Sequence, residues 1–220
     1  MKIRLGKKWF EFNDIQLDKM YIDEGMEGTI YRLGEDALKI YSKYPAKDRL
    51  NEEEALKLSK IVTERFLLPK KLIYDEDNNF IGYSTKFIED YDFKNVRYLP
   101  MNEFCSELDI LYNELKSLND NLVDVEDYSL YNAIYNGEIY IVDPGSYRFV
   151  KDEGYLHKDN KYKLNEFIIW YLLPYITDLS RPKKKQFRKN VDITEDIVDF
   201  MRYESLDNES VNDFVKRITR

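Results

Sequence analysis

The feature that most constrains this chain is a change of pattern after Glu89. Upstream, short segments alternate apolar and polar side chains and are separated by glycine and acidic residues, which is typical of a meander of β-strands. Downstream, longer apolar periodicities predict helices over 101–118 and 164–175. A run of strands followed by a run of helices favours two packed parts over alternating βαβ units. We therefore expect an α+β fold with two domains, 1–88 and 89–220.

The first domain is expected to be an antiparallel sheet with one helix. The predicted strands cover 2–12, 19–24, 29–33, 37–41, 70–74 and 80–88, and the predicted helix covers 48–62. The second domain is expected to be mainly helical, and 191–220 has the pattern of two short amphipathic helices. The junction is expected at 87–93, and clefts between two such domains are favoured sites for small ligands.

The composition indicates a folded chain that is not a general nucleic-acid binder. Of the 220 residues, 43% are hydrophobic and 15% aromatic, whereas disordered chains are poor in aromatic residues. The formal net charge of −8 has the wrong sign for displacing counterions from nucleic-acid phosphates. A local exception is a basic run made of Arg181, Lys183, Lys184, Lys185, Arg188 and Lys189. We favour a solvated loop between helices for this run, and the alternative is a docking patch for an acidic partner.

A few single residues restrict the chemistry and the location. Cys105 is the one cysteine, which excludes an intrachain disulfide and fits a reducing compartment. His157 is the one histidine, which argues against a His-rich metal site or a Ser-His-Asp triad, and we expect it at the surface. The longest apolar stretch, 167–176, is broken by Pro174 and is too short to span a bilayer. We therefore expect a cytoplasmic protein without a membrane partner.

A glycine-rich segment joins two of the predicted strands. It runs from Asp23 to Ile30 and contains Gly25 and Gly28. Glycine has no Cβ, so backbone amides in such a loop can approach phosphate oxygens closely. An ordinary hairpin turn explains the same pattern, and the segment alone does not decide between the two.

A lysine, Lys39, lies inside a predicted strand whose neighbouring residues are apolar. Leaving a buried cation unpaired is costly, so this side chain needs an anion unless it reaches solvent at a sheet edge. The next helix offers three candidate carboxylates, Glu52, Glu53 and Glu54. We prefer Glu54, because its spacing from Leu58 places both on one helix face.

Three oxygen-bearing side chains flank a predicted hairpin. Asn136-Gly137 is a hairpin turn signal between apolar segments. Asp127 and Asn132 come just before the first strand, and Asp143 follows the second strand, so all three are expected at one end of the hairpin. Oxygen ligands suit a hard cation such as Mg²⁺, and Asn132 and Asp143 are the candidate metal ligands. The alternative is that the three residues only form turns.

In this order, the four features resemble the signature of the protein-kinase superfamily: a glycine-rich loop, a strand lysine with a helix glutamate, a catalytic loop and a DFG segment. The resemblance covers roughly 21–147 and assigns these parts to Gly25, Gly28, Lys39, Glu54, Asp127, Asn132 and Asp143. It implies a bilobal kinase-like fold with a reduced helical second lobe. It also implies ATP as phosphoryl donor and Mg²⁺, or Mn²⁺, as the metal ion.

The resemblance implies a role for each matched residue. Lys39, held by Glu54, would orient the α- and β-phosphates, and Asp127 would be the catalytic residue that accepts or orients the acceptor proton. Asn132 and Asp143 would hold the metal ion. An adenine pocket would be formed by Ile22, Ile30, Ala37 and Ile134, and backbone hydrogen bonds to the base would come from the hinge between Phe87 and Glu89.

Departures from the family pattern keep three functions open. Val125 and Glu126 replace the histidine and arginine before the catalytic aspartate, Ser129 stands where protein kinases carry a lysine, and Pro144 replaces the phenylalanine of DFG. No APE motif is present in the sequence. The main interpretation is a protein kinase for Ser, Thr or Tyr hydroxyls, including its own. The alternatives are a kinase for a small-molecule hydroxyl and a catalytically silent nucleotide-binding scaffold.

Overall fold

The computed structural model describes residues 1–42, 49–90 and 92–220. The chain forms two compact units, of which unit 1 comprises Met1–Thr63, Leu67–Ile88 and Asp143–Phe149, and unit 2 comprises Glu64–Phe66, Glu89–Val142 and Val150–Arg220. The segment 143–149, expected in the helical domain, is therefore grouped with the sheet-rich unit 1. Asp48, the expected start of the first helix, and Tyr91, within the expected junction, lie outside the described residues.

Unit 1 is built on a seven-stranded sheet with the strand order β2-β1-β6-β7-β5-β4-β3, in which every neighbouring pair is antiparallel. Its strands are β1 (Lys2–Leu5), β2 (Lys8–Glu11), β3 (Tyr21–Glu24), β4 (Gly28–Leu33), β5 (Asp36–Tyr41), β6 (Lys71–Tyr74) and β7 (Phe80–Lys86). Its other elements are α1 (Asp14–Met20), α2 (Glu52–Leu58), a 3₁₀ turn (Pro144–Ser146) and β11 (Arg148–Phe149).

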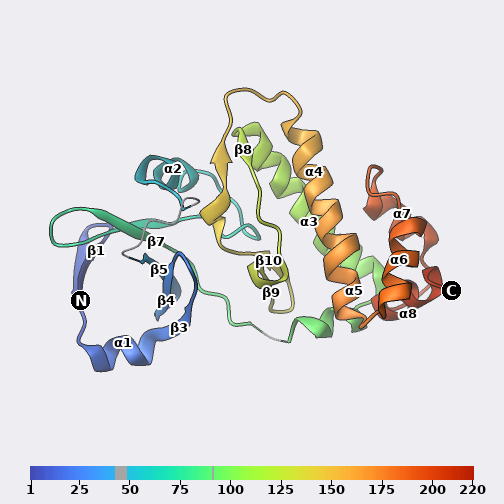
Figure 1. Cartoon of the computed structure of the whole chain (residues 1–220), viewed down its shortest axis with the longest axis horizontal. Helices are drawn as coiled ribbons and strands as arrows, with labels where there is room; N and C mark the ends of the chain where they lie inside the picture. Colours follow the sequence, from blue (N-terminus) through green and yellow to red (C-terminus); the bar gives the residue numbers. More distant parts are fainter. Residues whose placement is uncertain (43–48, 91) are drawn as a thin grey trace. The chain divides into compact units, whose positions relative to one another are not determined.

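The sheet must curl, because a short helix connects its two edge strands. α1 follows β2 at one edge and leads into β3 at the other. Seven flat strands would span about 29 Å at roughly 4.8 Å between neighbours. The 7-residue helix is only about 10 Å long at 1.5 Å per residue. Figure 1 shows α1 running between the two ends of the curled sheet.

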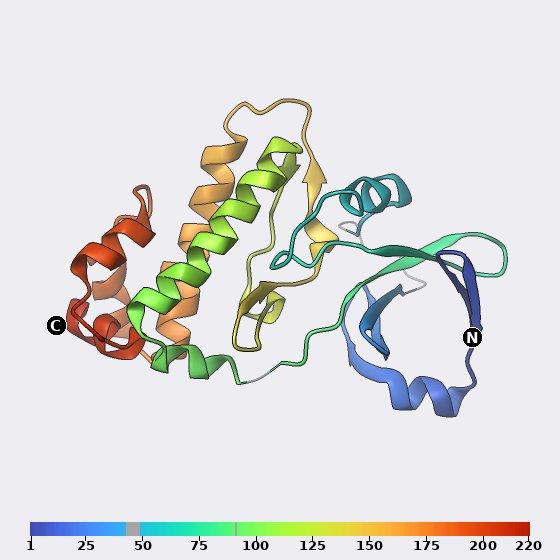
Figure 2. The ribbon, with the colours of Figure 1, turned by 180° about the vertical axis from the view of Figure 1, so that it is seen from behind.

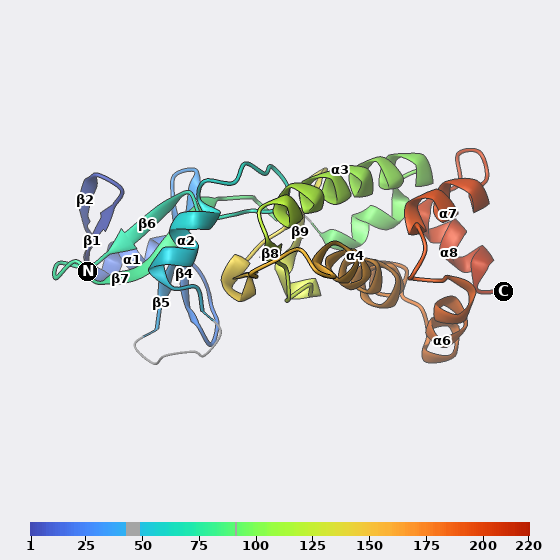
Figure 3. The ribbon, with the colours of Figure 1, turned by 90° about the horizontal axis from the view of Figure 1, so that it is seen from above.

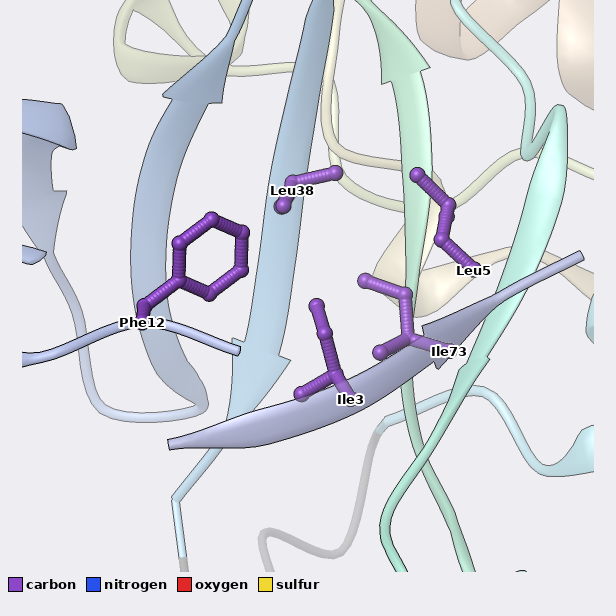
Figure 4. Packing of buried hydrophobic residues seen from close by; sticks show 5 residues of the cluster. All are labelled: Ile3, Leu5, Phe12, Leu38 and Ile73. Atoms are coloured by element: carbon purple, nitrogen blue, oxygen red, sulfur yellow. The ribbon is translucent and has the colours of Figure 1, made fainter. Parts of the chain in front are cut away.

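The hollow side of this sheet holds a hydrophobic cluster, drawn in Figure 4. Its buried members are Ile3, Leu5, Phe12, Leu38 and Ile73. Leu17 and Met20 of α1 pack against this cluster. Leu17 and Met20 are only partly buried, and α1 therefore covers this side of the sheet with part of their apolar surface while its other residues stay exposed.

Several elements of unit 1 differ from expectation. The strand expected over 2–12 is a hairpin, β1 and β2, that turns at Gly6 with φ 60°. The start of the strand expected over 19–24 belongs to α1, so unit 1 has two helices among its described residues where one was expected. Asn13 accepts a hydrogen bond from the Gln16 backbone N–H, and Gln16 accepts one from Asn13 N–H, which closes a capping box at the start of α1.

Unit 2 is mainly helical, as expected. Its helices are α3 (Met101–Asp120), α4 (Leu156–Glu166), α5 (Leu173–Ile176), α6 (Arg181–Asn190), α7 (Ile197–Glu204) and α8 (Val211–Ile218), with 3₁₀ turns at Phe93–Tyr98 and Leu130–Asn132. Its strands are β8 (Val123–Asp124), β9 (Ala133–Tyr135) and β10 (Ile139–Ile141). α3 packs against α4 and α7, and Figure 2 shows α3 and α4 side by side.

The apolar segment expected as one buried helix is continuous with α4 but changes its winding. A π-helical segment, Phe167–Leu172, joins α4 to α5, and Pro174 stands in the first turn of α5. Proline lacks the N–H that an α-helix interior needs, and a π-turn before it accommodates the missing hydrogen bond. No helix in the described parts of the chain is long and apolar enough to cross a membrane.

The basic run is a helix, so its assignment as a loop was wrong. α6 starts with Pro182 in its first turn, a position where proline is favoured, and its Phe187 is fully buried. The two amphipathic helices expected over 191–220 are present as α7 and α8. His157 is exposed at the start of α4, as expected.

Candidate functional site

Lys39 is nearly buried on one face of the sheet in unit 1. Its strand neighbour Leu38 lies in the hydrophobic cluster, and because side chains alternate along a strand, Lys39 faces the opposite side. Only 8% of Lys39 is exposed. Its Nζ lies 2.5 Å from Glu27 Oε2, and 2.5 and 2.7 Å from the two carboxylate oxygens of Asp143. The anion that the sequence demanded for this lysine is therefore a pair of carboxylates.

Asp143 is held by further donors in addition to Lys39. Its Oδ1 accepts a hydrogen bond of 3.2 Å from the Tyr83 hydroxyl and one of 3.3 Å from the Gly145 backbone N–H. Asp143 adopts a left-handed backbone conformation, with φ 58° and ψ 74°, directly before the 3₁₀ turn at Pro144–Ser146. Burial, followed by the charge of Asp143, raises the pKa of Tyr83 well above its ordinary value, so this hydroxyl stays a donor.

The predicted pairing of Glu54 with Lys39 is wrong. Glu54 is the third residue of α2, and its carboxylate accepts a hydrogen bond of 3.2 Å from the Asn51 backbone N–H. Asn51 in turn accepts one from Glu54 N–H, which forms a capping box. The two other candidates also have other partners: Glu52 accepts a hydrogen bond from Tyr74, and Glu53 pairs with Lys57.

The two glycines of the predicted phosphate loop serve different purposes. The loop is a tight hairpin closed by a 2.9 Å hydrogen bond from Gly25 N–H to Gly28 C=O. A Cβ at Gly28 would lie 2.1 Å from the Ile40 carbonyl oxygen, so β4 and β5 approach too closely there for any other residue. A Cβ at Gly25 would meet nothing within 4 Å. Between them, Glu27 turns its carboxylate toward Lys39.

The residues expected to contact adenine in unit 1 are only partly brought together. Ile30 pairs directly with Lys39 across β4 and β5, and Ala37 lies two residues before Lys39, so these three share one sheet face. Ile22 is 41% exposed and lies at an irregularity in the pairing of β3 with β4.

The expected hinge residues lie at and beyond the end of β7. The Phe87 N–H donates to the Glu35 carbonyl at 2.8 Å, and the Arg32 guanidinium lies 4.1 Å from the centre of the Phe87 ring. Glu89 is exposed. Phe87 is thus fixed by unit 1, and its N–H is already engaged.

The residues expected in a catalytic loop, Asp127 and Asn132, lie together in unit 2. The Asn132 side-chain amide donates to the Asp127 carboxylate at 2.9 Å and to the Asp127 carbonyl at 3.2 Å. The predicted hairpin is confirmed, with β9 paired to β10 and Gly137 in the turn at φ 76°. At its open end, Val142 N–H donates to the Asn132 carbonyl at 2.8 Å, so the backbone of Asn132 lies beside the residue that precedes Asp143. Ile134, expected at adenine, is half-buried in β9.

Lys39, Glu27, Asp143 and Tyr83 form a cluster, called here the lysine cluster. Two of its members, Glu27 and Tyr83, were not predicted from the sequence. Glu27 lies between the two glycines, before Lys39 in the sequence, whereas the predicted partner Glu54 lies in the helix that follows. Tyr83 lies on β7 directly opposite Lys39. Once β5 and β7 are known to be neighbours, alternation places both side chains on one face, but the sequence alone does not give that pairing.

The lysine cluster fits a cation that arrives with phosphates. Among residues 1–42, 49–90 and 92–220, no group of three or more His, Cys, Asp or Glu side chains is placed to hold a metal ion. Glu27 and Asp143 nevertheless bring two negative charges to the single ammonium of Lys39. Mg²⁺ typically takes one or two carboxylates from a protein and its other ligands from phosphates and water. Asp143, which has further donors that keep it in place, is the carboxylate that suits such an ion.

Comparison with known proteins gives matches to structures only. No protein-family model and no curated protein matches the sequence. The structure is similar to the PknI kinase domain of Mycobacterium tuberculosis, with 13% identity, a TM-score of 0.54, and coverage of 90% of this chain and 92% of that one. A mutant form of the same domain matches at 14% identity and a TM-score of 0.53, with the same coverage of both chains.

A viral kinase gives a similar match. The Cydia pomonella granulovirus kinase PK-1 is 15% identical, with a TM-score of 0.50 and coverage of 93% of this chain and 89% of that one. Likeness at such low identity establishes the fold, and the predicted α+β architecture is confirmed by it. The chain has a protein-kinase-like fold.

Proposed function

We propose that this chain is an ATP-dependent phosphotransferase that moves the γ-phosphoryl group to a hydroxyl. The observation that carries the proposal is the contact of Lys39 with Asp143, residues 104 positions apart in the sequence. These are the two residues that the resemblance assigned to phosphate and metal binding. A purely structural ion pair would need one carboxylate, whereas this lysine has two.

In this proposal, phosphate oxygens replace Glu27 at the Lys39 ammonium. Both are anions that accept hydrogen bonds from the same donor, and Glu27 lies on a hairpin tip whose neighbour Met26 is 96% exposed. Asp143 would stay in place through Tyr83 and the Gly145 N–H and would hold Mg²⁺ or Mn²⁺. The metal ion, when bound, neutralises charge that develops on the transferring phosphoryl group.

Alignment and deprotonation of the acceptor hydroxyl would depend on Asp127 and Asn132. The Asn132 amide donates to one carboxylate oxygen of Asp127 and so fixes the orientation of this carboxylate. An oriented carboxylate can accept the proton of an attacking hydroxyl or align that hydroxyl for transfer. Because the amide nitrogen is engaged, the amide oxygen of Asn132 is the atom that would serve the metal ion.

A second candidate, a kinase for a small-molecule hydroxyl, is favoured by Ser129. A serine stands where protein kinases carry a lysine that assists transfer to a peptide hydroxyl, and its carbonyl accepts a hydrogen bond from Asn132 N–H. A protein kinase stays the first proposal. The third possibility, a catalytically silent nucleotide-binding scaffold, would bind ATP without transferring its phosphoryl group.

Incubation with γ-labelled ATP and Mg²⁺ tests the proposal. Wild-type protein is compared with Asp143→Asn and Asp127→Asn, and with Asp18→Asn, an exposed aspartate of α1, as a charge-matched control. Label in the protein or in an added peptide, lost in the first two variants only, supports a protein kinase. Labelled small-molecule hydroxyls without labelled protein support the second candidate. ATP binding without transfer to any acceptor would leave the scaffold.

A further inference from the structure

Helix α6 carries a concentration of positive charge that the rest of unit 2 does not neutralise. Its 10 residues, RPKKKQFRKN, include six cations and no acid. Five of these cations are exposed, and Lys184 is half-buried. No ion pair joins any of the six to another residue within the described ranges. This contrasts with a chain whose net charge is −8.

Four of these six charges are unfavourable for the helix, whereas Arg188 and Lys189 lie in its last turn, where the helix dipole favours cations. Three lysines and an arginine occupy its first turns, where the helix dipole disfavours cations. Arg181, Lys185 and Lys189 follow one another at four-residue intervals, and like charges at this spacing repel by roughly 0.2–0.5 kcal/mol per pair. Ser180, at the N-cap, makes no side-chain capping hydrogen bond. Helix stability therefore does not explain why α6 carries cations in its first turns and in a row at four-residue intervals.

The inner side of α6 holds the helix in place. Phe187 is fully buried, and Arg188 donates to the Trp170 carbonyl at 3.0 Å while its guanidinium lies 5.2 Å from the centre of the Trp170 ring. At the C-terminal end of α6, the Asn190 amide donates to the Ile218 carbonyl of α8 at 2.6 Å. α6 contacts the π-helical segment and α8, and Figure 3 shows α6 and α8 at the C-terminal end of unit 2. The outer row of cations is thus presented on a fixed helix.

We propose that the outer face of α6 is a docking surface for an acidic, extended peptide segment of a partner protein. Arg181, Lys185 and Lys189 lie in one row, about 6 Å apart at 1.5 Å rise per residue. An extended chain rises about 3.3 Å per residue, so every second side chain recurs on one side at about 6.6 Å. Acidic residues at alternate positions would therefore match the row one to one. This role is independent of phosphoryl transfer.

The charge spacing favours a peptide over nucleic acid. Duplex DNA carries about one charge per 1.7 Å of its axis, which is denser than the six cations spread over the roughly 15 Å of α6. Base stacking on a single strand uses successive open aromatic rings. Of the two rings beside α6, Trp170 is half-buried with the Arg188 guanidinium 5.2 Å from its centre, whereas Tyr171 is exposed. The net charge of the chain is negative, so it repels any polyanion. This repulsion is weaker for a short peptide with few charges than for a nucleic acid with many.

Fluorescence anisotropy of a labelled peptide tests the surface. The probe peptide alternates glutamate with glycine. One comparison probe is the same peptide with glutamine in place of glutamate. The other is a single-stranded oligothymidine of the same charge as the probe peptide. The test variant is R181Q with K185Q and K189Q. The control variant, K7Q with K8Q and K60Q, removes the same charge from exposed lysines of unit 1.

The proposal predicts binding of the acidic peptide that weakens with salt and falls at least about tenfold in the test variant but not in the control. The Tm of the test variant should be no lower than that of wild type, because the substitutions remove repulsion between like charges. A Tm measured at or above the wild-type value shows that the loss of binding does not come from a folding defect. Equal peptide affinity of the two variants, or no binding of the acidic peptide, would overturn the proposal. Tighter binding of the oligothymidine would replace it with a nucleic-acid surface.

Discussion

Replacing Gly28 by alanine should destabilise unit 1 strongly, although the change adds a single methyl group. The added Cβ would lie 2.1 Å from the Ile40 carbonyl oxygen, 2.8 Å from the Ile40 carbonyl carbon and 2.9 Å from the Tyr41 Cα. Ordinary contacts begin at 3.4 Å, so the backbones of β4 and β5 would have to separate by about 1 Å. Overpacking of this kind costs roughly 1–3 kcal/mol, and a clash with backbone belongs at the upper end.

Thermal unfolding followed by circular dichroism measures this effect. A loss of about 3 kcal/mol corresponds to a drop in Tm of roughly 6–12 °C for a chain of this size. Gly25→Ala, three positions earlier in the same hairpin, is the matched control, because its Cβ would meet nothing within 4 Å. Its Tm should stay within about 1–2 °C of wild type. Equal Tm values for the two variants would refute the close approach of β4 and β5 at Gly28.

Three further outcomes are expected. Burial raises the pKa of Asp36, but hydrogen bonds and charges of Lys70 and Lys71 lower it further, below its ordinary value. Asp36→Asn should therefore cost about 0.5–1 kcal/mol in denaturant unfolding at pH 7, and the difference should vanish as the pH falls below about 4. Burial raises the pKa of Cys105 to about 11, so a thiol reagent at pH 8 should label it only on unfolding, and fast labelling of folded protein would contradict its placement in α3. Glu27→Gln should tighten ATP binding several-fold in calorimetry, because phosphates would no longer compete with a carboxylate, and weaker binding would mean that Glu27 positions the lysine instead.

The parts of the site that could be predicted from sequence are those with a strong local signal. Asn136-Gly137 between apolar segments predicted the hairpin of β9 and β10. The loop between the paired residues Tyr135 and Ile139 contains a glycine, Gly137, at φ 76°, a conformation that glycine adopts readily. Lys39 within an apolar strand required an anion, and the structure supplies one. The identity of the anion depends on which strands are neighbours, and pairing between distant strands leaves no local trace.

Two of the errors had a local signal that we did not use. Asn13 and Gln16, and likewise Asn51 and Glu54, have the spacing of a capping box. The first pair marks the start of α1, and the second assigns Glu54 to a helix end. The third error, the loop expected over the basic run, came from reading charge as solvation. Pro182 in the first turn of α6 and the buried Phe187 are what a helix requires there.

Calorimetric titration with Mg²⁺-ATP tests the central claim most directly, which is that Lys39 and its carboxylates form a nucleotide phosphate site. Wild-type protein is compared with Lys39→Met and with Lys60→Met, which changes an exposed lysine after α2. Circular dichroism checks that both variants are folded. We predict binding by wild type and by Lys60→Met, and affinity at least about tenfold lower for Lys39→Met, the loss of one charge-assisted phosphate contact. No binding by wild type at millimolar ATP, or equal binding by folded Lys39→Met, would contradict the account.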